Sequence, residues 1–155
     1  HQLSLMTHES VQFAINNFDK AIAIDKTFKQ AYLAKTDAYR IQMTALEQPN
    51  LIFPKLISSA VDLMAVDTNS AQVNSIVGLT YVHALQWNDA IKMLTSAKLS
   101  NSELPTTELG LALINVALGN KANVKKHLDL ALNIDPLNPE VADWGYGQMF
   151  ILNKG

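Results

Sequence analysis

The chain has 155 residues, 48% of them hydrophobic and 17% charged, with a formal net charge of -2. This composition can bury a core and excludes an intrinsically disordered chain. The only arginine is Arg40, and direct nucleic-acid contact is not expected because phosphate binding needs clustered basic side chains. The absence of cysteine excludes disulfides, thiol catalysis and zinc–thiolate sites. The longest apolar stretch, 109–118, is too short for a membrane span, which needs about 20 residues.

The first third of the chain has helical periodicity. Thr7 is expected to cap a helix that ends near Ile24, in which apolar residues recur every three or four positions. A second helix is expected over 29–46. The two prolines of the 47–54 segment predict a loop, because proline cannot continue a helix interior. Another helix is expected over 55–66.

The remainder predicts two clear helical pairs and a final helix. The first pair lies within 71–100, with a turn at 86–89, and the second carries Leu111 and Ala112 in its first helix and turns at Gly119-Asn120. Pro136 and Pro139 close the second pair. A last helix is expected over 140–152.

Residues recur at a spacing of 34 positions. Leu94 and Leu128, and likewise Ala97 and Ala131, are 34 apart. Such a period predicts tandem helix–turn–helix units, in which small residues allow the helices to approach closely. Between positions 21 and 63 the spacing is 42, and we expect the extra eight residues in the proline-containing loop, where an insertion disturbs packing least.

These features resemble the tetratricopeptide repeat (TPR). The matching residues in the two best units are Val77-Gly78, Tyr81, Trp87, Ala90, Leu94 and Ala97, and then Leu111-Ala112, Gly119, Leu128, Ala131 and Pro136. Lys26 and Thr68 depart from the pattern, since the family usually has proline there. The resemblance implies an all-α solenoid of antiparallel helix pairs, with about four repeats and a stretched second repeat. We expect one array over 1–155, with repeats at about 1–26, 29–68, 71–102 and 105–136 and a terminal helix at 139–152.

The resemblance also implies a partner-binding groove lined by the first helix of each pair. The groove residues would be Gln30, Leu33, Asp37, Arg40, Gln72, Ser75, Leu79, Val82, His83, Leu109, Leu113 and Val116. The lysines and asparagines with which some TPR proteins clamp a C-terminal carboxylate are missing. The groove would suit an amphipathic helix or an apolar peptide. The alternative, that Leu79, Leu113 and Val116 pack between repeats, stays open.

No pattern points to chemistry of its own. His8 and His127 have no acidic or histidine partner at ligand spacing, so no metal site is expected, and His83 is more often an uninvolved histidine than a functional one. No nucleophile–base set or carboxylate pair supports catalysis, so neither an enzyme nor a cofactor is expected. The last helix carries apolar side chains on more than one face, which predicts either further chain or a homodimer through Trp144, Met149 and Phe150.

A narrower resemblance concerns the function. The run from Thr7 to Asp25, followed by the 31–39 segment, is similar to the TPR region of bacterial winged-helix transcription regulators and nucleotide cyclases. It implies a regulatory or sensory interaction module, without membrane insertion, that belongs to a longer protein. A periplasmic ectodomain of a membrane-anchored regulator is preferred over a cytoplasmic location. The alternative is a free-standing TPR scaffold or chaperone for envelope or secretion components.

Overall fold

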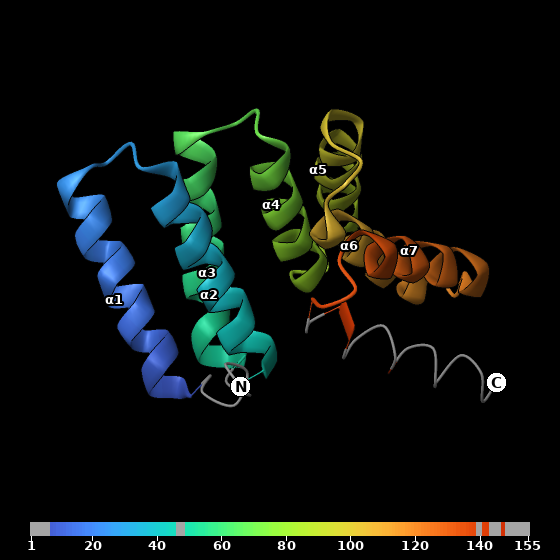
Figure 1. Cartoon of the computed structure of the whole chain (residues 1–155), viewed down its shortest axis with the longest axis horizontal. Coiled ribbons are helices and arrows are strands. Elements are labelled where there is room, and N and C mark those ends of the chain that lie inside the picture. The colour runs from blue at the N-terminus through green and yellow to red at the C-terminus, as the bar shows by residue number, and fades with distance from the viewer. Residues whose placement is uncertain (1–6, 46–48, 139–140, 143–146, 148–155) are drawn as a thin grey trace. The chain divides into compact units, whose positions relative to one another are not determined.

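The computed structural model describes residues 7–45, 49–138, 141–142 and 147. The chain divides into two compact units, His1–Thr68 and Asn69–Gly155, here called unit 1 and unit 2. All regular structure in the described ranges is helical. Unit 1 holds α1 (His8–Ile24), α2 (Lys29–Ala45) and α3 (Pro49–Val66), and unit 2 holds α4 (Ala71–His83), α5 (Trp87–Ser100), α6 (Pro105–Ala117) and α7 (Lys121–Ile134) (Figure 1). None of these described helices is long and apolar enough to cross a bilayer.

Unit 2 repeats itself at the predicted spacing. The first helices α4 and α6 begin 34 residues apart, at Ala71 and Pro105, and the second helices α5 and α7 begin 34 apart, at Trp87 and Lys121. The two hairpins, α4/α5 and α6/α7, also pack against each other through α4–α6 and α5–α6 contacts. The predicted turn at 86–89 is shorter in the structure, because α5 already begins at Trp87.

The eight extra residues of the second repeat lie in helices and not in a loop, so that prediction is wrong. In unit 1, α2 has 17 residues and α3 has 18, whereas α4 has 13 and α5 has 14. Each helix of the α2/α3 hairpin is thus four residues longer, or about one turn of 3.6 residues. The interval between α2 and α3 is then three residues, as it is between α4 and α5. Four residues is close to a whole turn, so the apolar face is kept.

Pro54 lies inside α3, where the sequence predicted a loop. It is the sixth residue of the helix, so its missing N–H removes one bond near the start at a cost of about 3 kcal/mol. The neighbouring Ile52 and Leu56 are 3% and 0% exposed. Burying each such side chain contributes about 1.5–3 kcal/mol, so tertiary packing outweighs the penalty of the proline.

The start and end of α1 are fixed by side-chain hydrogen bonds. As predicted, Thr7 is the N-cap: its Oγ1 accepts from the Ser10 N–H at 3.1 Å, and Ser10 Oγ accepts from the Thr7 N–H at 3.0 Å. After the helix, Asp25 Oδ1 accepts from the Thr27 hydroxyl at 2.7 Å and from its N–H at 2.8 Å. These two bonds, the hydroxyl's first, lower the pKa of Asp25.

The core of unit 2 is centred on Leu94. This side chain of α5 is 0% exposed and lies against Gly78 of α4 and Gly110 of α6. A Cβ on Gly78 would lie 2.7 Å from Leu94 Cγ, and a Cβ on Gly110 would lie 2.8 Å from Leu94 Cδ1. Both glycines are therefore needed for close approach, and one leucine joins the two hairpins.

The turns inside the two hairpins place equivalent residues in the left-handed region. Leu85 has a φ of 59° and Gly119, 34 positions later, has a φ of 70°. Glycine adopts this region without penalty, whereas a side chain at Cβ is strained there. The first hairpin thus stores backbone strain that the second avoids.

Candidate functional site

In unit 1, the predicted polar end of the groove is an ion pair that is already formed. Arg40 Nη2 donates to Asp37 Oδ1 at 2.6 Å, and Arg40 Nε donates to the same oxygen at 3.1 Å. The Arg40 side chain is 3% exposed, against 39% for Asp37. Leu33 is half-buried and Gln30 is exposed. The arginine therefore serves the fold of α2, and the accessible predicted side chains here are Gln30, Leu33 and Asp37.

In unit 2, half of the predicted groove residues are buried. The buried ones are Ser75, Leu79, Val82 and Leu109, whereas His83 and Leu113 are half-buried and Gln72 and Val116 are exposed. Leu79 and Val82 share a core cluster with Ile114 of α6, so Leu79 packs between repeats, which was the open alternative. Leu113 is partly buried and packs against the same cluster, whereas Val116, three residues later on α6, is 39% exposed. The groove itself stays a prediction.

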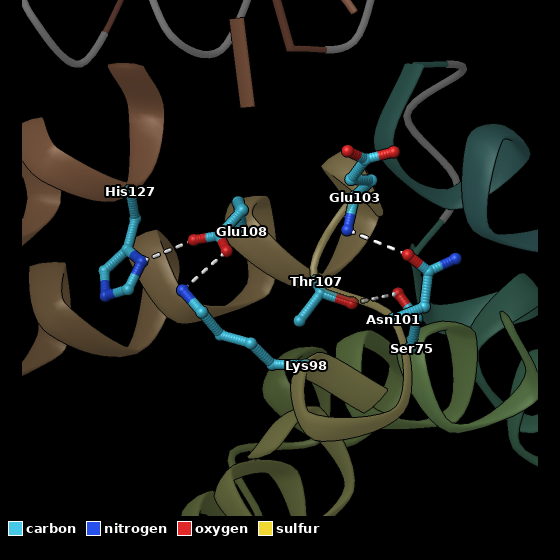
Figure 2. Close-up of polar contacts among 7 residues, drawn as sticks. All are labelled: Ser75, Lys98, Asn101, Glu103, Thr107, Glu108 and His127. Carbon is cyan, nitrogen blue, oxygen red and sulfur yellow. Dashed lines mark hydrogen bonds and ion pairs between the residues drawn. The ribbon is translucent and has the colours of Figure 1, made fainter. Parts of the chain in front are cut away.

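Hydroxyl and amide groups also join the helices of unit 2. Thr107 Oγ1 of α6 donates to Ser75 Oγ of α4 at 3.0 Å, and both residues are 1% exposed (Figure 2). Asn74 Nδ2 donates to Ser96 Oγ at 3.2 Å and so links α4 to α5. Ser75 is thus committed to a contact between repeats.

The most distinctive polar feature is a buried carboxylate with two basic partners, here called the Glu108 network. Lys98 Nζ of α5 lies 2.7 Å from Glu108 Oε1, and His127 Nδ1 of α7 lies 2.6 Å from Glu108 Oε2. The Glu108 side chain is 2% exposed, whereas those of Lys98 and His127 are 36% and 13% exposed. Figure 2 shows the two partners approaching the carboxylate from different helices. One residue of α6 therefore bonds both flanking second helices.

The Glu108 network ties three helices of unit 2 together. Both oxygens of the buried Glu108 carboxylate are engaged, one by Lys98 and the other by His127. A buried charge is tolerated only when it is paired, and structural ion pairs of this kind occur without catalysis. No group of three or more metal-ligating side chains occurs in the part of the chain that the structure describes.

The expectation for His127 concerned partners at ligand spacing, and Glu108, the acidic residue bonded to it, lies 19 positions away on α6. Sequence spacing along one helix could not show this pair, since the two residues lie on different helices. A signal was present nevertheless: Glu108 is the only charged residue in the apolar segment 104–118. An isolated charge in such a segment needs a partner. The proposed self-association residues Trp144, Met149 and Phe150 lie outside the described residues.

Comparison with known proteins identifies the fold. No protein-family model and no curated protein sequence matches the chain. TTC0263, a thermophilic TPR protein of Thermus thermophilus, is 18% identical with a TM-score of 0.71, over 96% of this chain and 76% of that chain. Two structures of MamA are 18% and 19% identical, with TM-scores of 0.56 and 0.57, over 90% and 94% of this chain and 81% and 79% of theirs. The predicted all-α, TPR-like fold is thereby confirmed.

Proposed function

We propose that this chain is a protein-interaction module that binds an apolar or amphipathic peptide on the first helices of unit 2. The observation that carries the proposal is the accessible side of α6, where Val116 is 39% exposed and Leu113 is half-buried. Because these residues are three apart, they share one face of the helix. Gln72 and half-buried His83 of α4 supply polar groups on the packed neighbouring helix.

A peptide library tests this proposal. The chain is panned with a displayed library of random peptides, and the affinities of the selected peptides are measured by fluorescence anisotropy. Val116→Glu should weaken binding at least ten-fold, because a charge would be desolvated under the peptide. Leu99→Glu on α5 is the matched control, since Leu99 is 84% exposed on a second helix. No selected peptide, or equal losses in both variants, would refute the proposed surface.

The finer proposal concerns the setting of the module. We place it in a bacterial transcription regulator or signalling protein, preferably as a periplasmic ectodomain, on the strength of the sequence similarity over Thr7–Asp25 and 31–39. A scaffold for envelope or secretion components is the rival. The gene sequence upstream of the codon for His1 decides between them: a winged-helix or cyclase domain supports the regulator, and a signal sequence or lipid anchor alone supports the scaffold.

Homodimer formation through the 139–152 segment is a separate proposal, which rests on the apolar sequence alone. Sedimentation velocity tests it with Trp144→Ala and Phe150→Asp. If the segment mediates a dimer, both variants should sediment as monomers where the parent chain does not. Identical sedimentation of all three proteins would remove the dimer.

A further inference from the structure

The two hairpins of unit 2 meet through two buried polar pairs, here called the boundary pairs. In the first, Thr107 Oγ1 of α6 donates to Ser75 Oγ of α4 at 3.0 Å. In the second, Lys98 Nζ of α5 donates to Glu108 Oε1 of α6 at 2.7 Å. Ser75, Thr107 and Glu108 are each 1% exposed, and Figure 2 shows both pairs. Each pair has one partner in each hairpin, so both form only when these two hairpins are neighbours.

Hydrogen bonds at the starts of the helical segments show which positions are equivalent. The backbone N–H groups of Asn74, Glu108 and Ala142 each donate to the carbonyl four positions earlier, at 2.9, 3.4 and 2.9 Å. Positions 74, 108 and 142 therefore occupy the same place in successive repeats. The second helices keep the same step, because α5 and α7 begin 34 residues apart. Each boundary position can thus be compared with the one that follows it by 34 residues.

One repeat later, the four boundary positions hold apolar residues. In place of Ser75, Lys98, Thr107 and Glu108 they are Leu109, Leu132, Val141 and Ala142. Leu109 and Val141 are 2% and 1% exposed, and Leu132 and Ala142 are half-buried. The boundary between the two hairpins is therefore polar on both sides, and the equivalent positions one repeat later are apolar on both sides.

We propose that the boundary pairs fix the order of the repeats: the α6/α7 hairpin is accepted after α4/α5 and rejected after another α6/α7 hairpin. If a second α6/α7 hairpin followed the first, its Glu108 would meet Leu132 instead of lysine. Its Thr107 would likewise meet Leu109 instead of serine. A buried hydroxyl and one carboxylate oxygen would then lack partners, which is costly in a protein interior. Buried polar groups specify register in the same way in coiled coils.

The mismatch carries this discrimination, and not the strength of the matched pairs. Replacing both partners of a buried ion pair by packed apolar side chains is often neutral, whereas removing one partner is strongly destabilising. If the pairs merely added stability, changing them would have the same effect whichever hairpin came before. The inference goes beyond the proposed function, because it does not involve the surface of Leu113 and Val116.

A double-mutant cycle in the full chain tests the match at one pair. Lys98→Leu should lower the urea midpoint of unit 2, followed by tryptophan fluorescence, because it leaves the buried carboxylate without its lysine. In the Glu108→Ala background the same substitution should raise the midpoint, since leucine and alanine then stand as they do at positions 132 and 142. The two shifts should differ by about 0.5 M. Lys92→Leu, at an exposed site of α5, is the control and should shift the midpoint equally in both backgrounds.

A duplicated chain tests the order of the hairpins. Residues 105–138 are inserted a second time directly after Asn138, so that the second copy of Glu108 follows Leu132 at the spacing of Ala142 in the parent. Thr107→Val and Glu108→Ala in the second copy should raise the urea midpoint of this chain, because they reproduce the residues at 141 and 142. The same two substitutions in the first copy should lower it, although both variants have the same composition. If the duplicated chain does not fold, folding of the second-copy variant alone supports the proposal.

Three results would overturn the proposal. One is a Lys98→Leu shift of the same sign in the parent and in the Glu108→Ala background. Another is an equal shift from the two substitutions in either copy of the duplicated chain. The third is failure of the second-copy variant to unfold in a single cooperative transition, since the apolar residues should then be sufficient for the added hairpin to dock.

Discussion

Gly78→Ala should destabilise unit 2, although alanine is the better helix former. The new Cβ would lie 2.7 Å and 2.8 Å from Leu94 Cγ and Cδ2, and 3.2 Å from the Leu94 backbone nitrogen. Rotation of the leucine side chain can relieve the first two contacts but not the third. The α4 and α5 backbones must therefore move apart.

The magnitude follows from two opposed terms. Alanine in a helix interior is favoured over glycine by about 1 kcal/mol, whereas overpacking a close-packed core costs about 1–3 kcal/mol. Because the backbone contact limits relaxation, we expect the upper half of the overpacking range, about 2–3 kcal/mol, and so a net loss of about 1–2 kcal/mol after the propensity gain. Gly110→Ala meets only the ends of the leucine side chain, at 2.8 Å and 2.9 Å, so its loss should be smaller.

Urea unfolding followed by tryptophan fluorescence measures this loss, because both tryptophans, Trp87 and Trp144, belong to unit 2. The helix-propensity difference between alanine and glycine is measured separately at Lys92, which is exposed on α5. It is the difference in unfolding free energy between the Lys92→Ala and Lys92→Gly variants. Leu94→Ala should cost less in the Gly78→Ala background than in the parent, because truncating the leucine there also relieves its clash with the new Cβ. Without a clash, Gly78→Ala should raise the unfolding free energy by the alanine–glycine difference measured at Lys92. That result would refute the close-packing argument.

Three further predictions concern stability, and the first two use the same unfolding assay. Leu85→Gly should stabilise unit 2 by about 1 kcal/mol, because strain of a non-glycine residue at positive φ costs about 1–3 kcal/mol. Little packing is lost, since the Leu85 side chain is 68% exposed. An unchanged midpoint of urea unfolding would contradict this prediction. Glu108→Gln should destabilise unit 2 by about 1–3 kcal/mol, equally at low and high salt. Asp129→Asn, which breaks the exposed ion pair with Lys125, is the control and should cost at most about 0.5 kcal/mol. Asp25→Asn should destabilise unit 1 at pH 7. The folded-state pKa of Asp25 lies below its usual 3.8, so the ionised carboxylate stabilises the folded state above pH 3.8. The difference in stability between the parent and the variant should therefore disappear as the pH falls through the folded-state pKa. Circular dichroism would follow that last variant, and a deficit independent of pH would refute the assignment to the Thr27 hydrogen bonds.

The sequence predicted the hairpins of unit 2 well, because a repeat imposes the same pattern twice. The register that relates Leu94 to Leu128 places both at buried sites of second helices. The error at Pro54 arose because local helix penalties were weighed without the burial of Ile52 and Leu56. Local rules describe one helix, whereas the packing of two helices decides such a case.

The candidate site was less predictable, for a related reason. Periodicity shows which helix face an individual residue occupies but not which neighbouring helix covers that face. Leu79 and Val116 both belong to first helices, yet one is 0% and the other 39% exposed. The pairing of Glu108 with Lys98 and His127 is likewise a tertiary property, since these residues come from three helices.

The Glu108 network also bears on the kinetics of unit 2. The His127 bond lies within the α6/α7 hairpin, whereas the Lys98 bond joins α5 to α6 and so requires both hairpins. Contacts that form only after both hairpins have docked are absent from an early transition state, and removing them accelerates unfolding more than it slows folding. The Lys98–Glu108 pair would then act mainly on the unfolding rate: most of its contribution to stability lengthens the lifetime of the assembled repeats, and little of it speeds their folding.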